Sequence, residues 1–385
     1  MFMFEKAIIG GRRYWTWIAA LAAVAALGAL GYSRQLDHGL AVTGLSRDVT
    51  WGLYIAQFTF LVGVAASAVV VVLPFYLHDY RAFARVTILG EFLAIAAVVM
   101  SGLFIFIDLG QPSRVLNVVL FASPSSMMFW DLLALGGYLV LNAVITLVTL
   151  SAERRDVAPP RWIVPVIIVS IPWAISIHTV TAFLYNGLPG RPFWLTALLA
   201  PRFLASAFAT GPALLVLLCL AMRRLTRFDA GAEPIRRLGL VVTYAVLVNA
   251  FFVLLELFTV FYARIPGHME AYTYLFFGIG GHGALVPWMW ASVATGLTAL
   301  GLLLLPGTRS RAGMLAAACA LVVVSLWIDK GLGLVVGGFV PSPLGALTEY
   351  RPTLNESVIV TGVWAIGFLL VTVFFKITLE VRREA

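Results

Sequence analysis

Long runs of apolar residues, separated by short clusters of charged residues, extend along the whole chain. A helix crosses a hydrocarbon core of about 30 Å with roughly 20 residues, so these runs are long enough to span a bilayer. The strands of a membrane barrel would instead alternate apolar and polar residues. The pattern therefore predicts an all-α integral membrane protein, with residues 1–385 forming a single polytopic membrane domain of about ten transmembrane helices. The predicted helices lie near 15–31, 51–77, 87–107, 126–150, 161–185, 203–222, 238–262, 282–305, 312–328 and 355–376.

Composition agrees with this interpretation. Of the 385 residues, 61% are hydrophobic and 11% are charged, whereas roughly a quarter of the residues of a soluble domain are charged. The two cysteines, Cys219 and Cys319, lie in separate apolar runs, so no C-x-x-C motif is available to bind a metal or an iron–sulfur cluster.

The 26 Lys and Arg residues are distributed unevenly between the predicted connections. With a cytoplasmic N-terminus, 18 of the 26 lie on the cytoplasmic side, as the positive-inside rule requires. The other side would hold Arg34, Arg47, Arg114, Arg191, Arg202, Arg264, Lys330 and Arg351. We therefore expect both termini in the cytoplasm and interpret the net charge of +8 as a sign of membrane topology, with no role in binding nucleic acid. The longest polar connections, 108–125, 186–202, 263–281 and 329–354, are then all external, where a partner protein would dock.

Several polar residues fall inside the predicted helices. Asp131 and His178 lie in the outer halves of consecutive helices, and Asn249 and Glu256 are one i,i+7 step apart on one face of another. Glu91 is the main acidic residue toward the cytoplasm. Because a charge at bilayer depth costs on the order of 3 kcal/mol, these side chains are expected to face the bundle interior and to have partners. Each could tie two helices together, or Asp131 and His178 could share a proton and so serve catalysis.

Two other classes of membrane protein remain open on the residues alone. His178 and His282 could ligate a haem as in a b-type cytochrome anchor, although His282 stands at the very start of its helix. Acidic residues and Gly/Pro breaks are also found in ion-coupled secondary transporters, although here they crowd the outer half and the outer loops.

Two loops resemble a known family. The stretch DLGQPSRVLNVVLFASPSSMMFWD, residues 108–131, is similar to a loop of the NrfD/polysulfide reductase membrane-subunit (PsrC) family, where Asp-Leu-Gly-x-Pro-x-Arg precedes a Met-x-x-Trp-Asp helix start. The stretch HTVTAFLYNGLPGRPFWLTALLAPRFLASAFATGPALL, residues 178–215, resembles the next outer loop of that family. The resemblance covers residues 45–305 well, and the chain is most similar to the DsrP/HybB branch of sulfur metabolism.

The resemblance implies NrfD-like helical bundles in a bacterial or archaeal cytoplasmic (inner) membrane. It also implies a haem-free protein without its own iron–sulfur cluster, which binds menaquinone or ubiquinone and exchanges electrons with a periplasmic ferredoxin-like iron–sulfur subunit. A multihaem cytochrome c and further redox subunits would complete the complex. The family's loop elements match Asp108, Arg114, Asp131, His178, Arg191 and Trp194.

Quinol oxidation releases two protons, so the site needs a base and hydrogen-bonding groups for the ring. We expect His178, with a pKa of about 6.5 in water, to accept a proton, and Asp131 to orient the ring or to pass the proton outward. Aromatic side chains such as Trp130, Tyr185 and Trp194 could enclose the headgroup, although tryptophan and tyrosine at helix ends also serve as interface anchors. Glu256, Asn249 and Glu91 are candidates for a proton pathway.

Overall fold

The computed structural model describes residues 7–65, 67–78, 80–226 and 228–384. Within these ranges ten helices are long and apolar enough to cross a membrane, and no β-strand is formed. The prediction of a multi-pass, all-α membrane protein is therefore confirmed. The helices are α1 (Arg12–His38), α2 (Leu53–Ala65), α3 (Ser67–Leu77), α4 (Ala84–Asp108), α5 (Asn117–Leu120), α6 (Met127–Arg154), α7 (Ile163–Asn186), α8 (Leu199–Leu225), α9 (Ala232–Tyr262), α10 (Pro266–Phe276), α11 (Val286–Leu304), α12 (Pro306–Ser310), α13 (Ala312–Leu326), α14 (Leu334–Gly337) and α15 (Leu354–Glu384).

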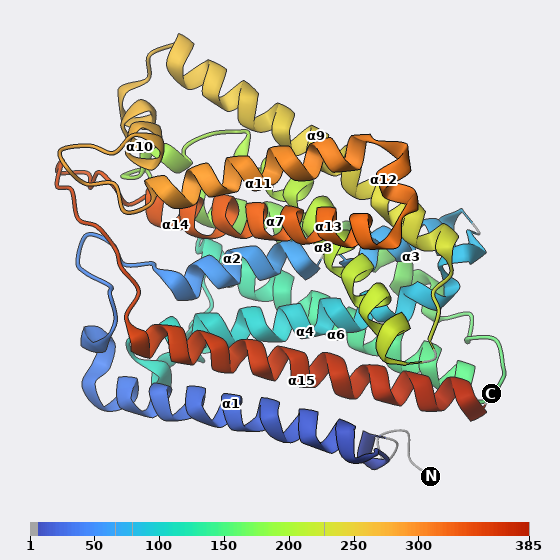
Figure 1. Ribbon diagram of the computed structural model, residues 1–385. Coiled ribbons are helices and arrows are strands. Elements are labelled where there is room, and N and C mark those ends of the chain that lie inside the picture. The colour runs from blue at the N-terminus through green and yellow to red at the C-terminus, as the bar shows by residue number, and fades with distance from the viewer. Residues whose placement is uncertain (1–6, 66, 79, 227, 385) are drawn as a thin grey trace.

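The two ends of the molecule differ. Both ends of the described chain lie at one end of the helices, which we call the terminal end (Figure 1). The long connections that contain α5 and α10, together with the segment between α14 and α15, lie at the opposite end, which we call the loop end (Figure 1). An even number of crossings places the two termini together. That the terminal end is cytoplasmic stays a prediction.

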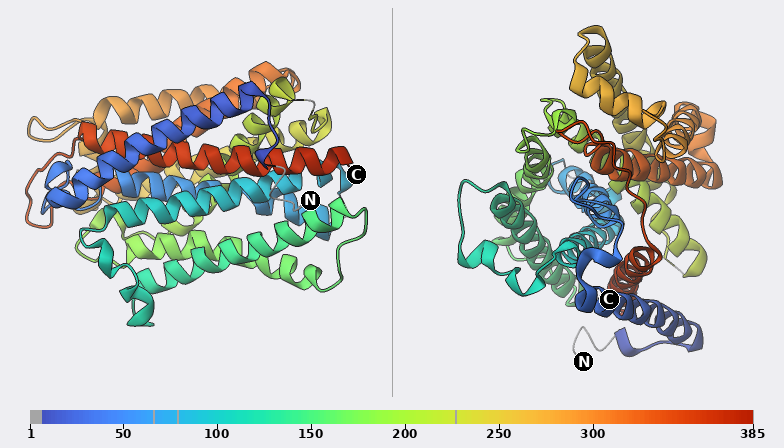
Figure 2. Two further views of the ribbon diagram at one scale, coloured as in Figure 1. Left: turned by 90° about the horizontal axis from the view of Figure 1, so that it is seen from below. Right: turned by 90° about the vertical axis from the view of Figure 1, so that its left-hand side faces the viewer.

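The helices form two bundles that meet along α2 and α8 (Figure 2). In the first bundle α2 and α3 pack with α4, α6 and α7. In the second bundle α8 packs with α9 and α13, and α11 packs with α13 and α9. Every residue of α2 from Leu53 to Ala65 is buried, which makes α2 the centre of the molecule. A helix that is apolar all round can be accommodated in this way, because protein surrounds it on every side.

Helices α1 and α15 pair with each other outside the two bundles and contact the first through α4. Small residues allow this pairing, since a Cβ on Gly28 would lie 2.6 Å from the Cα of Gly362. At the loop end the buried Glu356 carboxylate accepts hydrogen bonds from the Gly44 and Thr353 amides, each at 2.7 Å, and from the Tyr350 hydroxyl at 2.6 Å. Glu356 therefore fixes the start of α15 to the rest of the loop end.

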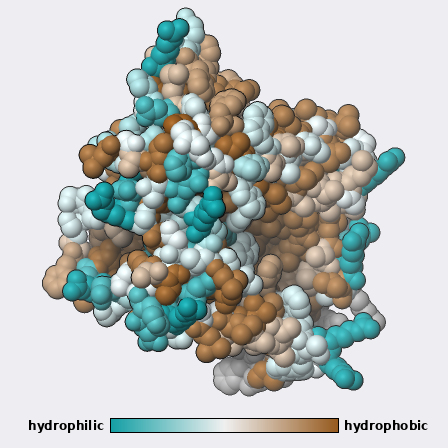
Figure 3. Space-filling model, turned by 60° about the vertical axis from the view of Figure 1, so that its left-hand side comes forward, coloured by the Kyte–Doolittle hydropathy of each residue, from teal (hydrophilic) through white to brown (hydrophobic). Residues whose placement is uncertain are grey.

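The surface matches a membrane protein. In Figure 3 hydrophilic side chains gather at the loop end and again at the terminal end, while the flank between them is mainly hydrophobic. Charged side chains at both ends and an apolar band between them are what a bilayer requires.

One predicted boundary is wrong in an informative way. The ninth run was expected to end at residue 328 and to give way to a loop at 329. Instead α13 continues through a π-helical segment, η6 (Trp327–Gly333), into α14, so the candidate span reaches Gly337. The charged pair Asp329 and Lys330 interrupts the hydropathy pattern but not the helix, because the protein supplies both side chains with an interior environment.

Candidate functional site

Asp131 and His178 both lie inside the first bundle. The Asp131 side chain on α6 is buried and accepts a hydrogen bond of 2.6 Å from the hydroxyl of Thr181 on α7. His178 stands one turn before Thr181 on α7 and is 1% exposed. Both ring nitrogens of His178 are without a hydrogen-bond partner among the described residues. Asp131 is therefore hydrogen-bonded to Thr181, and not to His178.

An aromatic cluster lies at the loop end, where the bundles meet. Tyr185, Trp194 and Trp51 are in ring contact, and Phe339 packs edge-on against both tryptophans. The hydroxyls of Tyr185 and Thr59 are hydrogen-bonded at 2.5 Å, which ties α7 to α2. Tyr185 and Trp194 are completely buried, so both are structural members of the interior and not interface anchors.

Arg191 and Trp194 connect the 187–198 loop to the second bundle. The Arg191 guanidinium donates to the carbonyls of Phe339 and Asp48, both at 3.0 Å, and lies 4.4 Å above the Phe339 ring. The Trp194 Nε1 donates to the carbonyl of Leu334 at 2.9 Å. Burial lowers the pKa of Arg191 from its usual value. With both planar groups engaged by protein, Arg191 and Trp194 position the loop.

Lys330 of η6 points into the interior. Its side chain is 5% exposed, its ammonium lies 4.3 Å from the centre of the Phe203 ring, and it has no hydrogen-bond partner among the described residues. A Cβ on Gly63 of α2 would lie 3.2 Å from Lys330 Nζ, so a glycine makes room for the amine. Lys330 therefore lies where η6 meets α2 and α8, the two helices along which the bundles pack.

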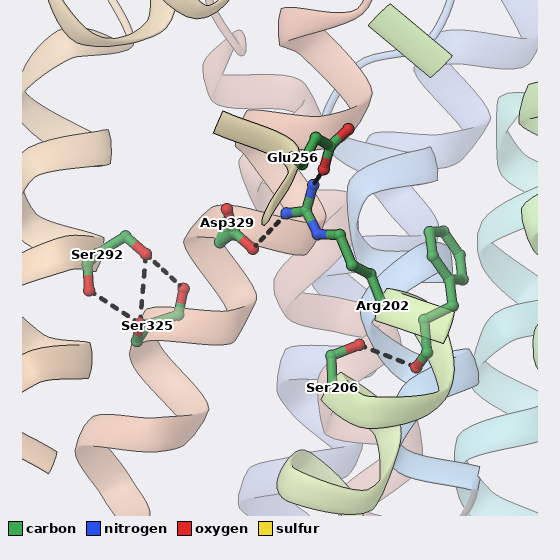
Figure 4. Close-up of polar contacts among 7 residues, drawn as sticks. Arg202, Ser206, Glu256, Ser292, Ser325 and Asp329 are labelled. Atoms are coloured by element: carbon green, nitrogen blue, oxygen red, sulfur yellow. Dashed lines mark hydrogen bonds and ion pairs between the residues drawn. The ribbon is translucent and has the colours of Figure 1, made fainter. Parts of the chain in front are cut away.

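A charged cluster lies within the second bundle (Figure 4). Arg202 of α8 forms an ion pair with Glu256 of α9, and its second terminal nitrogen lies 3.4 Å from the Asp329 carboxylate. Figure 4 shows the guanidinium pointing between the two carboxylates. Glu256 is 3% exposed. A buried acid at this depth was expected to have a partner, and the structure identifies that partner as Arg202.

A groove of about 530 Å³ lies beside this cluster, between α9, α10, α11 and α13. Its walls are mainly apolar and aromatic, and Asn249 and Asp329 are among its few polar lining residues. Asn249 lines this groove, whereas Glu256 on the same helix pairs with Arg202.

None of the remaining predicted site residues forms a hydrogen bond with His178. Asp108 ends α4, and its Oδ1 atom is buried without a partner among the described residues. Arg114 is exposed in a 3-10 turn, and Trp130 is 40% exposed with its Nε1 donating to the Pro124 carbonyl. That these two residues help to bind a quinone stays a prediction. The Glu91 carboxylate is buried and accepts from Thr146 at 3.0 Å.

The histidines of the described ranges do not gather into a metal site. Within the described ranges no three His, Cys, Asp or Glu side chains come together as a metal site. His282, considered above as a second haem ligand, lies at the loop end with its side chain 41% exposed, 3.9 Å from Glu349. His178 and His282 thus occupy different environments.

Sequence reasoning missed Arg202, Asp329, Lys330 and Thr181 as members of the site. The first three were assigned to the outer level by their positions, but an arginine at a helix start and an Asp-Lys pair at a helix end are also common at membrane interfaces. The available signal was the pair Asp329 and Lys330 next to a long apolar run. A ninth span that continued past residue 328 would have placed this pair inside the bundle. A threonine one turn from His178 gave no signal of its own.

The residues 41–340 match the family model described as polysulphide reductase, NrfD. The chain belongs to the NrfD family. The match extends beyond residue 305, the limit of the resemblance seen in the loops, and so includes the NrfD chain's ninth span with Asp329 and Lys330. Helix α15 lies outside the match.

Curated relatives of this NrfD protein are components of reductases and of a menaquinol oxidoreductase. It is 28% identical to a candidate membrane component of dimethyl sulfoxide reductase from Halobacterium salinarum, over 93% of this chain and 89% of that protein. It is 26% identical to the Hdr-like menaquinol oxidoreductase integral membrane subunit of Archaeoglobus fulgidus, over 69% and 64%. A component of the selenate reductase of Mesobacillus selenatarsenatis is 23% identical, over 52% and 55%.

A solved structure shares the fold. A chain in the structure of bd oxidase from Geobacillus thermodenitrificans superimposes with a TM-score of 0.54 at 11% identity, covering 94% of this chain and 98% of that one. At this identity the likeness concerns the helical architecture alone.

Proposed function

We propose that this chain is the quinone-reactive membrane subunit of a respiratory oxidoreductase complex. The names of the relatives support this, since one is a subunit of a menaquinol oxidoreductase and two are components of reductases. Family membership also favours a redox subunit over an ion-coupled transporter or a b-type cytochrome anchor. The DsrP/HybB branch, within an inner membrane of a bacterium or archaeon, is the more specific proposal that the two loop motifs support.

The observation that carries the proposal is the pair of unsatisfied ring nitrogens on His178. A buried polar group without a protein partner needs a ligand or an ordered water. The oxygens of a quinone or quinol fit this need, because an imidazole N–H can donate to a carbonyl oxygen and the other nitrogen can accept from a hydroxyl. Menaquinone or ubiquinone would be accommodated equally by these contacts.

His178 would hold the headgroup and accept the hydroxyl proton as electrons leave. A quinol supplies two electrons and two protons when it is oxidised. Asp131, oriented by the Thr181 hydroxyl at 2.6 Å, would receive the proton from His178 or stabilise the charged ring. Tyr185 and Trp194 are buried beside the connection to the loop end and would exclude water.

The electrons would pass to a partner docked on the loop end. This end carries all four long connections of the chain. If the terminal end is cytoplasmic, the loop end faces the periplasm, and a ferredoxin-like iron–sulfur subunit is the proposed partner there. A multihaem cytochrome c would accept electrons further on.

Variants at His178 and Asp131 test the proposal in the assembled complex. Replacing His178→Ala, Asp131→Asn, and both together should each slow quinol-dependent reduction of the partner by about a hundredfold or more, since a general base contributes on that scale. The double variant should be little worse than the more damaged single variant, because the two groups act on one proton path.

Ser170→Ala is the matched control. Ser170 is buried on the same helix as His178, and its hydroxyl donates to the Ile167 carbonyl of its own helix, so its loss should leave activity unchanged. Correct assembly is checked by size-exclusion chromatography. Well-assembled His178→Ala and Asp131→Asn complexes with full quinol activity would contradict the proposed site.

A further inference from the structure

The groove between α9 and α11 is a second candidate binding site, and contacts within the protein hold its walls in place. Its floor is fixed by reciprocal hydrogen bonds between α11 and α13, since Ser292 Oγ donates to the Ser325 carbonyl and Ser325 Oγ donates to the Ser292 carbonyl, both at 2.8 Å (Figure 4). The close fit at Gly296, where a Cβ would lie 2.7 Å from Ser325 Oγ, shows how tightly these helices meet. The groove therefore does not depend on a ligand to hold its walls in place.

The groove opens toward the hydrocarbon. Its rim includes Leu254 of α9 and Leu297 of α11, which are 64% and 66% exposed, and Phe277 beyond α10, which is 73% exposed. These residues lie on the flank of the second bundle, where lipid contacts the protein. A volume of about 530 Å³ is within the size of pockets that bind ring-containing small molecules.

The inner end of the groove is polar. Asp329 and Asn249 line it there, and both also face the small space beside Arg202 and Lys330. Asn249 is half-buried, and its amide can both donate and accept. Tyr272 and Trp290 add aromatic surface to the walls.

The charges that line the groove favour some membrane molecules over others as its occupant. Among the described lining residues the only ionisable acid or base of the Asp, Glu, Lys and Arg types is Asp329, a carboxylate. A phospholipid phosphate would find no cation on the groove wall, because Arg202 lies behind Asp329 and is already paired with Asp329 and Glu256. A neutral headgroup with hydroxyl donors would instead donate to Asp329 and pair with the Asn249 amide, while its ring packs on the aromatic walls.

We infer that the groove is a second binding site for an isoprenoid quinol, with the dihydroxy ring at Asn249 and Asp329 and the tail leaving between α9 and α11. The inference relies on the proposed function only for the presence of a quinol in the membrane. It concerns a different bundle from His178, so the two sites can be tested separately.

The test uses the purified chain in nanodiscs with a photoreactive azidoquinone that carries an isoprenoid tail. Cross-linked peptides are mapped by mass spectrometry and should include residues of α9 and α11. An excess of the unmodified quinol should compete with the label, whereas an excess of anionic phospholipid should not.

Three variants identify the occupant. Ala250→Trp fills the groove from α9 and should abolish labelling of these peptides, while Val248→Trp, on the exposed face of the same helix and outside the groove, should leave it unchanged. Asn249→Leu keeps the shape and removes the polar contact, and should weaken labelling by about fivefold, the equivalent of one hydrogen bond of about 1 kcal/mol. A groove that holds only an acyl chain would be labelled equally or more strongly in Asn249→Leu, which would overturn the inference.

The outcomes separate the two proposals. Labels confined to first-bundle peptides, and lost in His178→Ala, would support the site at His178 and refute the groove. Labels confined to α9 and α11, unaffected by His178→Ala, would support the groove and refute a headgroup at His178. Equal labelling in Ala250→Trp and Val248→Trp would mean nonspecific lipid-phase reaction and would also overturn the inference.

Discussion

Arg202 is the residue on which the charged interior of the second bundle depends. It contacts Glu256 and Asp329, which come from α9 and η6, while Glu256 itself is almost completely buried. Burying an ion pair brings little net stability, but removing one partner leaves the other charge without compensation. The arrangement is therefore more sensitive to losing one charge than to losing both.

Replacing Arg202→Met should destabilise the protein by about 3–5 kcal/mol, because Glu256 then remains as an unpaired buried carboxylate. The double variant Arg202→Met with Glu256→Met should recover most of this loss, since the buried carboxylate is removed and the remaining Asp329 carboxylate is partly exposed. Thermal unfolding in detergent measures the effect as a shift of Tm. A double variant no more stable than Arg202→Met would show that the pair is not the source of the loss.

We expect His268 of α10 to make the stability of the protein depend on pH. Burial lowers the pKa of His268, and the nearby Glu256 carboxylate offsets part of this effect. A histidine whose pKa is lower in the folded state stabilises the fold while it is neutral, and this contribution is lost as the pH falls below about 6.5, where the unfolded chain takes up the proton.

We therefore expect Tm to fall between pH 7 and pH 5 (a range set by the reference pKa of about 6.5) and to fall less in His268→Gln, which carries no proton. Melting curves across this range, in one buffer series at constant ionic strength, provide the measurement. Identical pH profiles for the two proteins would exclude a contribution from His268.

At the scale of elements, the segment formed by η6 and α14 packs against helices of both bundles. The segment places Asp329 toward Arg202 and, at the next position, Lys330 toward Phe203, while Leu334 accepts the Trp194 hydrogen bond. An inserted π-turn changes the face on which the following residues lie, and such turns recur at functional sites. Here the turn directs both charged side chains toward α8, and the Lys330 ammonium also lies beside Gly63 of α2.

Gly338 lies where this segment meets the aromatic cluster. A Cβ at Gly338 would lie 2.1 Å from Trp194 Cε2, so Gly338→Ala must displace the indole and should cost about 1–3 kcal/mol of stability. Gly301→Ala on α11 is the control, since its Cβ would meet no described atom within 4 Å. The measurement is Tm, and an equal effect of the two substitutions would contradict a specific role of Trp194 packing.

At the scale of the whole molecule, the direction of insertion decides which face meets the partner. The basic residues predict that the terminal end is cytoplasmic, with 18 of 26 Lys and Arg on that side. A reporter fused after Ala385 should therefore report a cytoplasmic location, and one inserted in the 186–202 loop should report an external location. The reverse result would move the loop end to the cytoplasm and remove the periplasmic partner from the proposal.

The sequence by itself determined the number of spans, their approximate positions, and the family. Each span is recognised from about 20 consecutive residues, because the cost of placing them in hydrocarbon depends on their composition and hardly on their neighbours. For the same reason the depth of Asp131, His178 and Glu256 followed from counting residues along each helix. The loop motifs around Asp108 and Arg191 predicted the NrfD family, which the family match confirms.

The tertiary structure alone decided which polar groups meet. Asp131 pairs with Thr181, Glu256 pairs with Arg202, and Lys330 lies against Phe203 beside Gly63. These contacts depend on the rotation of each helix about its axis and on which helices are neighbours, and both are set by packing summed over many side chains far apart in the sequence. Hydropathy also places charged residues at helix ends by default, so only the folded bundle, which solvates Asp329 and Lys330 with its own groups, could extend the ninth span to Gly337.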